Sequence, residues 1–158
     1  LMAGNIPLKD EKILERTTYH DPCNVARSGR ITEEPREILK TICADFVEMT
    51  PRGVDNYCCG GGSGFAIMSG HNFQDWRHHM TGRRKFRQIL EAFQDEAMDP
   101  EHPKYVCAPC SNCKGQIRDI IQYYDAWEKA GIYYGGLVEL IVNAMVDVEP
   151  GFIDWEWH

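Results

Sequence analysis

The chain has 158 residues, the size of one ordinary domain, and 43% of them are hydrophobic, so a substantial core can form. A formal net charge of -7 argues against nucleic acid as a partner, because phosphate binding requires a basic face. No stretch approaches the roughly 20 apolar residues of a membrane-spanning helix, so we expect no direct membrane span. The first residues lack the pattern of a signal peptide, and the chain starts at Leu1, so we expect part of a longer cytoplasmic subunit.

The apolar pattern predicts short strands that alternate with helices. β-branched and aromatic runs indicate strands, and apolar residues at a spacing of 3.6 indicate helices. The expected strands are 17–20, 54–57 and 104–107, and the expected helices carry the apolar residues within 38–47, 86–97, 117–124 and 137–145. Such alternation is typical of an α/β fold. We therefore expect a single compact domain with a small, mainly parallel sheet flanked by helices, and with the cysteine-bearing loops gathered at one end.

Two segments lie outside this pattern. Residues 1–16 are expected to form an N-terminal extension or linker and residues 149–158 an aromatic C-terminal tail, which leaves 17–148 as the domain. Within the domain, basic side chains cluster over residues 77–87. We interpret this cluster as a solvated helix face, and the alternative is a docking surface for an acidic partner protein.

Seven cysteines are a high number for a chain of this length. In a reducing compartment, clustered cysteines indicate metal-binding or redox chemistry rather than structural disulfides. Cys43 lies on or near the apolar face of a predicted helix, and we interpret it as a core residue. The other six form three groups, which are Cys23, then Cys58 with Cys59, then Cys107 with Cys110 and Cys113.

The adjacent pair distinguishes this set from an ordinary zinc site. The side chains of neighbouring residues diverge, so one zinc ion rarely binds both Cys58 and Cys59, whereas a cluster of several irons presents well-separated ligand positions. Soft thiolates at this density favour iron–sulfur or zinc over harder metals. Gly60, Gly61 and Gly62 follow directly, and their backbone amides are free to donate hydrogen bonds to anionic sulfur.

The cysteine groups and several segments between them follow one another in a defined order along the chain. The segments concerned are Tyr-His-Asp-Pro-Cys at 19–23, Arg30, Glu-Pro-Arg-Glu-Ile-Leu at 34–39, Val-Glu-Met at 47–49, Cys-Cys-Gly-Gly-Gly at 58–62 and Cys-Ser-Asn-Cys at 110–113. Over residues 17–145 the chain resembles the CCG, or cysteine-rich, domain. That family includes the catalytic subunits of heterodisulfide reductase and iron–sulfur subunits of glycolate and lactate oxidases and of quinone-linked reductases. The chain is most similar to the heterodisulfide-reductase-like subunit of the membrane-bound respiratory complex of sulfate reducers.

The resemblance implies a noncubane 4Fe-4S cluster, in which two smaller clusters share an iron and a sulfide. Its ligands, by position, would be Cys23, Cys58, Cys59, Cys110 and Cys113. Cys107 falls outside these five and is either an additional thiol near the cluster or a core residue. The gap between Cys59 and Cys110 is longer than the family's usual spacing, so we expect an insertion within 71–79 or 99–103.

The resemblance also implies an activity, which is reductive cleavage or reverse formation of a disulfide, heterodisulfide or trisulfide. Protons must then reach two leaving thiolates, and His20, close to Cys23, is the candidate donor. The alternative for His20 is an orienting hydrogen bond to Asp21 or to the backbone. Arg30 and Arg36 are interpreted as partners in structural ion pairs rather than as cations that attract an anionic substrate.

The electrons for such a reaction must come from elsewhere, since the sequence contains no ferredoxin-type cysteine run and no nucleotide-binding fingerprint. The expected partners are other subunits of a membrane-associated respiratory complex on the cytoplasmic face of the inner membrane. The expected substrate is a small sulfur-carrier protein or a low-molecular-weight disulfide. Two alternatives stay open: an electron-transfer module of a glycolate-oxidase-like, lactate-oxidase-like or quinone-linked oxidoreductase, and a structural zinc domain, which leaves the adjacent cysteines unexplained.

Overall fold

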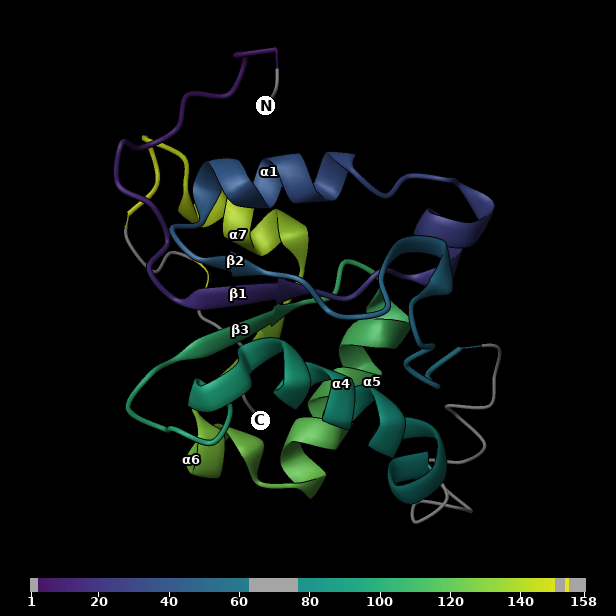
Figure 1. The fold of residues 1–158 in the computed structure, drawn as a ribbon. Helices are drawn as coiled ribbons and strands as arrows, with labels where there is room; N and C mark the ends of the chain where they lie inside the picture. The colour runs from purple at the N-terminus through teal and green to yellow at the C-terminus, as the bar shows by residue number, and fades with distance from the viewer. Residues whose placement is uncertain (1–2, 63–76, 150–152, 154–158) are drawn as a thin grey trace.

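A four-stranded parallel sheet forms the centre of the computed structural model, which describes residues 3–62, 77–149 and 153 (Figure 1). Its strands are β1 (Arg16–Tyr19), β2 (Phe46–Val47), β3 (Lys104–Cys107) and β4 (Ile132–Gly135). They lie in the order β2-β1-β3-β4, and every pairing between neighbours is parallel. This sheet, with helices on both sides, confirms the predicted α/β fold class.

Helices cover both faces of the sheet (Figure 1). One face carries α1 (Glu34–Ile42) and α7 (Leu137–Asn143), and the other carries α4 (Arg83–Phe93), α5 (Ser111–Tyr123) and α6 (Ala126–Ala130). Shorter turns of 3-10 or π type lie at Asn24–Ser28, Gly53–Asp55, Arg77–Gly82 and Gln94–Glu96. Within the described ranges, no helix has both the length and the apolar character needed to cross a bilayer.

The alternation of side chains along β3 divides the core into two clusters. Successive strand residues point to opposite faces of a sheet. Tyr105 and Cys107 therefore join the cluster that packs against α1 and α7, whereas Val106 joins the cluster that packs against α4 and α5. Cys43 belongs to the first cluster and is only 2% exposed, which confirms its interpretation as a core residue.

Two predicted elements were wrong, for local reasons. The helix expected to include Phe46 and Val47 ends at Ile42, because the backbone of Cys43 is extended (ψ 143°) and leads the chain into β2. The strand expected over 54–57 is instead a 3-10 turn that starts at Gly53, which has a φ of +63°. β4 and α6 were not predicted.

The structure describes most of the expected N-terminal extension but little of the expected C-terminal tail. Leu8 and Ile13 of the expected N-terminal extension pack against the cluster beneath α1 and α7, and they form isolated bridges to Met145 and Cys43. Of the expected tail, residues 150–152 and 154–158 lie outside the described residues, as do residues 71–76 of the expected insertion. The domain boundaries stay a prediction.

Candidate metal centre

The predicted ligands gather at the carboxyl edge of the sheet. The segment 20–23 directly follows β1, and the segment 108–110 directly follows β3. The carboxyl ends of parallel strands meet at one edge, so these two segments come together although they are far apart in sequence. The loop that carries Cys58 and Cys59 reaches the same edge after the turn at Gly53–Asp55.

The Cys-x-x-Cys pair lies across the start of α5. Cys110 is the N-cap residue, with extended backbone, and Cys113 lies in the first turn of the helix. Unpaired backbone N–H groups at a helix N-terminus favour negative charge nearby and thus favour thiolates over thiols. The helix start therefore holds two thiols in an environment that suits metal ligation.

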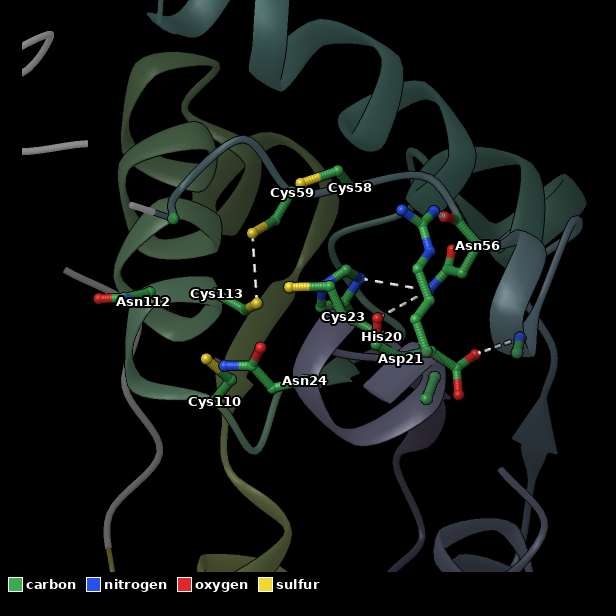
Figure 2. Close-up of a pocket in the computed structure, with 14 residues that line it drawn as sticks. His20, Asp21, Cys23, Asn24, Asn56, Cys58, Cys59, Cys110, Asn112 and Cys113 are labelled. Carbon is green, nitrogen blue, oxygen red and sulfur yellow. Dashed lines mark hydrogen bonds between the residues drawn. The ribbon is translucent and has the colours of Figure 1, made fainter. Parts of the chain in front are cut away.

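The cysteines of the site lie around one common space (Figure 2). The Sγ atoms of Cys59 and Cys113 are 3.2 Å apart, and a ring nitrogen of His20 lies within 4.8 Å of both. The sulfurs of Cys23 and Cys58 point toward this pair, and Cys110 lies beside Cys113 (Figure 2). All five cysteines line one pocket of about 100 Å³, together with nine other residues that include Asn24, Arg27 and Asn112.

The pocket has a buried side and an exposed side. Cys59 and Cys113 are buried, Cys110 is half-buried, and Cys23 and Cys58 are exposed. A group held by these sulfurs would therefore be anchored in the core and open to solvent on one side. Cys107 lies elsewhere: it is fully buried in the cluster beneath α1 and α7, on the other face of the sheet from Cys59 and Cys113.

Glycines let the loop of the adjacent cysteines pack closely against α5. The N–H groups of Gly60 and Gly61 donate to the sulfurs of Cys58 and Cys59, each at 3.3 Å. A Cβ atom on Gly61 would lie 2.5 Å from the carbonyl oxygen of Asn112, far inside contact distance. Any side chain at position 61 would thus push the loop away from the helix.

His20 is buried behind the sulfurs and is held by an amide. Its Nδ1 atom lies 3.4 Å from the Nδ2 atom of Asn56, and 1% of the residue is exposed. Burial, and then the charge of Lys85, hold the pKa of His20 well below its ordinary value. The imidazole is therefore neutral, and its hydrogen-bond partner is Asn56 rather than the predicted Asp21 or backbone.

Asp21 fixes the loop that follows β1. Its carboxylate accepts hydrogen bonds from Arg36 at 2.7 and 2.8 Å and from the backbone N–H of Gly53 at 2.7 Å. Arg36 also binds Glu48 at 2.7 Å and is 1% exposed. The prediction of a structural ion pair is confirmed for Arg36. For Arg30 it is wrong: this exposed residue, whose φ is +58°, forms no ion pair in the part of the chain that the structure describes.

The pKa values of the two adjacent thiols, Cys58 and Cys59, are raised. The hydrogen bond with Cys113 is the main cause that raises the pKa of Cys59 to about 12, and burial adds to it. The hydrogen bond with Cys59 and burial also raise the pKa of Cys58. Metal binding must therefore displace protons from both residues. Convergent soft sulfurs, two of which accept backbone N–H groups, fit an iron–sulfur cluster.

Comparison with known families supports the same conclusion. The profile of the CCG family, described as a cysteine-rich domain, matches residues 17–118, which is more than half of the chain. The matched range contains all five predicted ligands. The chain belongs to the CCG family of cysteine-rich domains.

Relatives of this CCG domain are parts of larger proteins. The Hdr-like menaquinol oxidoreductase iron–sulfur subunit 2 of Archaeoglobus fulgidus is 32% identical over 135 residues, 82% of this chain and 21% of the relative. A fumarate reductase (CoM/CoB) subunit of Methanothermobacter marburgensis is 43% identical over 116 residues, 73% of this chain and 20% of the relative. The chain thus spans about a fifth of the length of these relatives. No solved structure matches it significantly.

The sequence prediction missed the burial of Lys85 in the CCG domain. Lys85, expected on a solvated helix face, is 0% exposed, and its Nζ atom donates to the side-chain oxygens of Asn56 and Gln88. Burial lowers the pKa of Lys85 to about 7. The signal was present in the sequence, because Lys85 lies four residues before Ile89 and eight before Phe93, on the buried face of α4.

Proposed function

We propose that this CCG domain holds a noncubane 4Fe-4S cluster on Cys23, Cys58, Cys59, Cys110 and Cys113, and that it cleaves or forms a disulfide as part of a larger oxidoreductase. The convergence of these five thiols, from three distant segments, on one pocket carries the proposal. The names of two relatives, an oxidoreductase iron–sulfur subunit and a reductase subunit, agree with it.

The bound cluster would supply electrons to a sulfur–sulfur bond. Cleavage of a disulfide to two thiols consumes two electrons and two protons, so both must reach the pocket. The chain itself would give a substrate access to the pocket and orient it. Cys23 and Cys58 lie on the exposed side of the pocket, and Arg27, which also lines the pocket, adds a positive charge. This arrangement suits an anionic disulfide. The two protons would come from solvent through the exposed side of the pocket, and His20, whose ring nitrogen lies within 4.8 Å of the sulfurs of Cys59 and Cys113, is the candidate to pass one on to a leaving sulfur.

Electrons would come from other parts of a larger assembly. The relatives are about five times as long as the match, and one of them, from Archaeoglobus fulgidus, is named as a menaquinol oxidoreductase subunit. We infer that this domain works in a complex of that kind, held at the cytoplasmic face of the membrane by partner subunits. Its substrate would be a small sulfur-carrier protein or a low-molecular-weight disulfide or trisulfide.

A second function is favoured by another relative. The EtfAB:quinone oxidoreductase of Syntrophomonas wolfei is 22% identical over 82% of this chain. In that case the cluster would relay electrons to a quinone-linked or flavin partner and would bind no disulfide. Cys23 and Cys58 are exposed residues of the pocket, which favours substrate access over a relay, because a relay requires no open position.

The first test is metal content after anaerobic reconstitution. We expect about four irons and matching acid-labile sulfide per chain, with a paramagnetic signal of the oxidised protein that changes when thiols are added. Cys58→Ser is expected to abolish the signal. Cys43→Ala is the matched control, since this thiol lies in the core of the opposite face, and it should retain the iron.

Other outcomes separate the alternatives. Zinc without sulfide would overturn the redox function and leave a structural zinc domain. A cluster whose signal ignores added thiols would support the electron relay instead.

A further inference from the structure

The ammonium of Lys85 is buried among neutral partners. Its Nζ atom donates to Oδ1 of Asn56 at 2.9 Å, to Oε1 of Gln88, and to the sulfur of Met49 at 3.8 Å, all of which are neutral. Among the described residues, no carboxylate lies within ion-pair distance of it. A buried ammonium is costly unless a counter-charge compensates it.

The groups placed to compensate Lys85 are the cysteines of the pocket. Among charges that would raise its pKa, ionised Cys59 and Cys113 act most strongly, ahead of Asp21. The carboxylate of Asp21 is already bound by Arg36 on both oxygens. A cluster bound by these cysteines would be held by thiolates, so its ligands would bring negative charge into the pocket.

A polar chain connects the cation to the sulfurs. Asn56 accepts from Lys85 through Oδ1 and faces Nδ1 of His20 through Nδ2, at 2.9 and 3.4 Å. His20 in turn lies within 4.8 Å of the sulfurs of Cys59 and Cys113. The side chains of Lys85, Asn56 and His20 are 3% exposed or less, so water screens the cation poorly from the site.

We propose that Lys85 is the buried counter-charge of the metal-loaded site, a positioning residue that favours uptake of an electron by the cluster. The proposal rests on the function given above. Each electron added to a thiolate-bound cluster makes it more negative, and a fixed positive charge in a poorly screened interior stabilises that state. Burial lowers the pKa of Lys85, and the thiolates act against this, so loading also favours the charged ammonium.

The chain offers a matched control in Lys104. This lysine is also 0% exposed, but its Nζ atom donates to the backbone oxygens of Asp99 and His102, at 2.7 and 2.6 Å. It is the first residue of β3, and the pocket follows the last residue of that strand. Lys104→Met therefore removes a buried charge at the edge of the sheet opposite the pocket.

The test compares Lys85→Met and Lys104→Met in the anaerobically reconstituted chain. At a fixed electrode potential, Lys85→Met is expected to lower the ratio of reduced to oxidised cluster about tenfold, a negative shift of about 59 mV for one electron. Lys104→Met is expected to leave the potential unchanged. In the metal-free chain, Lys85→Met should unfold at a higher urea concentration than the unmodified protein, because an uncompensated charge is gone.

An unchanged potential in Lys85→Met, with iron and sulfide bound, would overturn this inference and leave the proposed function intact. Failure of the unmodified chain to bind iron and sulfide would overturn both. Should Lys85→Met not load a cluster, Asn56→Asp provides the second variant. It keeps the lysine but adds a negative charge beside it, and a potential that does not fall would equally overturn the proposal.

Discussion

The Asp21 carboxylate joins the loop after β1 to the rest of the molecule. It binds both terminal nitrogens of Arg36 and the N–H of Gly53, and the side chains of the pair are each 1% exposed. Breaking a buried pair by removing one partner leaves an uncompensated charge. The position of His20 and Cys23 thus depends on an ion pair that touches no sulfur.

Arg36→Met is expected to lower the free energy of unfolding by about 3–5 kcal/mol, because it leaves Asp21 charged and buried. Urea denaturation of the metal-free chain measures this change. The double variant Asp21→Asn/Arg36→Met should recover part of the loss, since neither charge remains. Arg52→Met is the control: its pair with Glu33 is solvent-exposed, so its loss should change stability little. Equal effects of Arg36→Met and Arg52→Met would contradict the prediction.

At the scale of elements, the first turn of α5 and the loop of the adjacent cysteines form one unit. Cys59 meets Cys113 because Gly61 lets the loop approach the helix. A Cβ atom at position 61 would lie 2.5 Å from the carbonyl oxygen of Asn112 and 2.8 Å from Cβ of Gln116. Neither neighbour is the free end of a flexible side chain, so the loop must move.

Gly61→Ala is therefore expected to reduce iron uptake sharply and to lower the free energy of unfolding by about 1–3 kcal/mol. Gly115→Ala, two residues after Cys113, is the matched control. A Cβ atom there meets nothing within 4 Å, and alanine in a helix interior is favoured over glycine by about 0.5–1 kcal/mol. That variant should be more stable and should bind iron normally. Iron per chain and the urea midpoint check both, and normal loading of Gly61→Ala would contradict the close packing.

The sequence predicted those elements whose local pattern is strong. β1, β3, α4, α5 and α7 follow from apolar spacing and β-branched runs, and they carry most of the core. β2 has two residues, and its identity as a strand comes from its pairing with β1 rather than from its own composition.

The site was predictable in part, for a related reason. The cysteine spacing and the family resemblance predicted a convergence of thiols at one end of the sheet. Neither Asn56 nor Lys85 carries a local signal of partnership, because each acquires its neighbours through tertiary packing. The helical spacing of Lys85 relative to Ile89 indicates burial, but it does not indicate what the ammonium faces.

At the scale of the whole molecule, the sheet separates two populations of cysteine. Cys43 and Cys107 lie in the core cluster beneath α1 and α7, whereas Cys59, Cys110 and Cys113 belong to or pack against the cluster on the other face of the sheet. The sheet therefore shields structural thiols from the chemistry of the pocket. Cys107 has a pKa well above its ordinary value because it is buried, which makes it a weak nucleophile.

This separation predicts a residue-specific pattern of alkylation. In the metal-free chain, brief treatment with N-ethylmaleimide should label Cys23 first, since it is exposed, and Cys58 more slowly, since its raised pKa leaves less thiolate. Cys43 and Cys107 should react only after unfolding. After anaerobic loading of iron and sulfide, Cys23 and Cys58 should become unreactive, because their sulfurs then bind metal.

Mass spectrometry of the tryptic peptides measures the extent of labelling at each of these cysteines. Persistent labelling of Cys23 in the loaded chain would remove it from the ligand set, and labelling of Cys107 in the folded chain would contradict its place in the core.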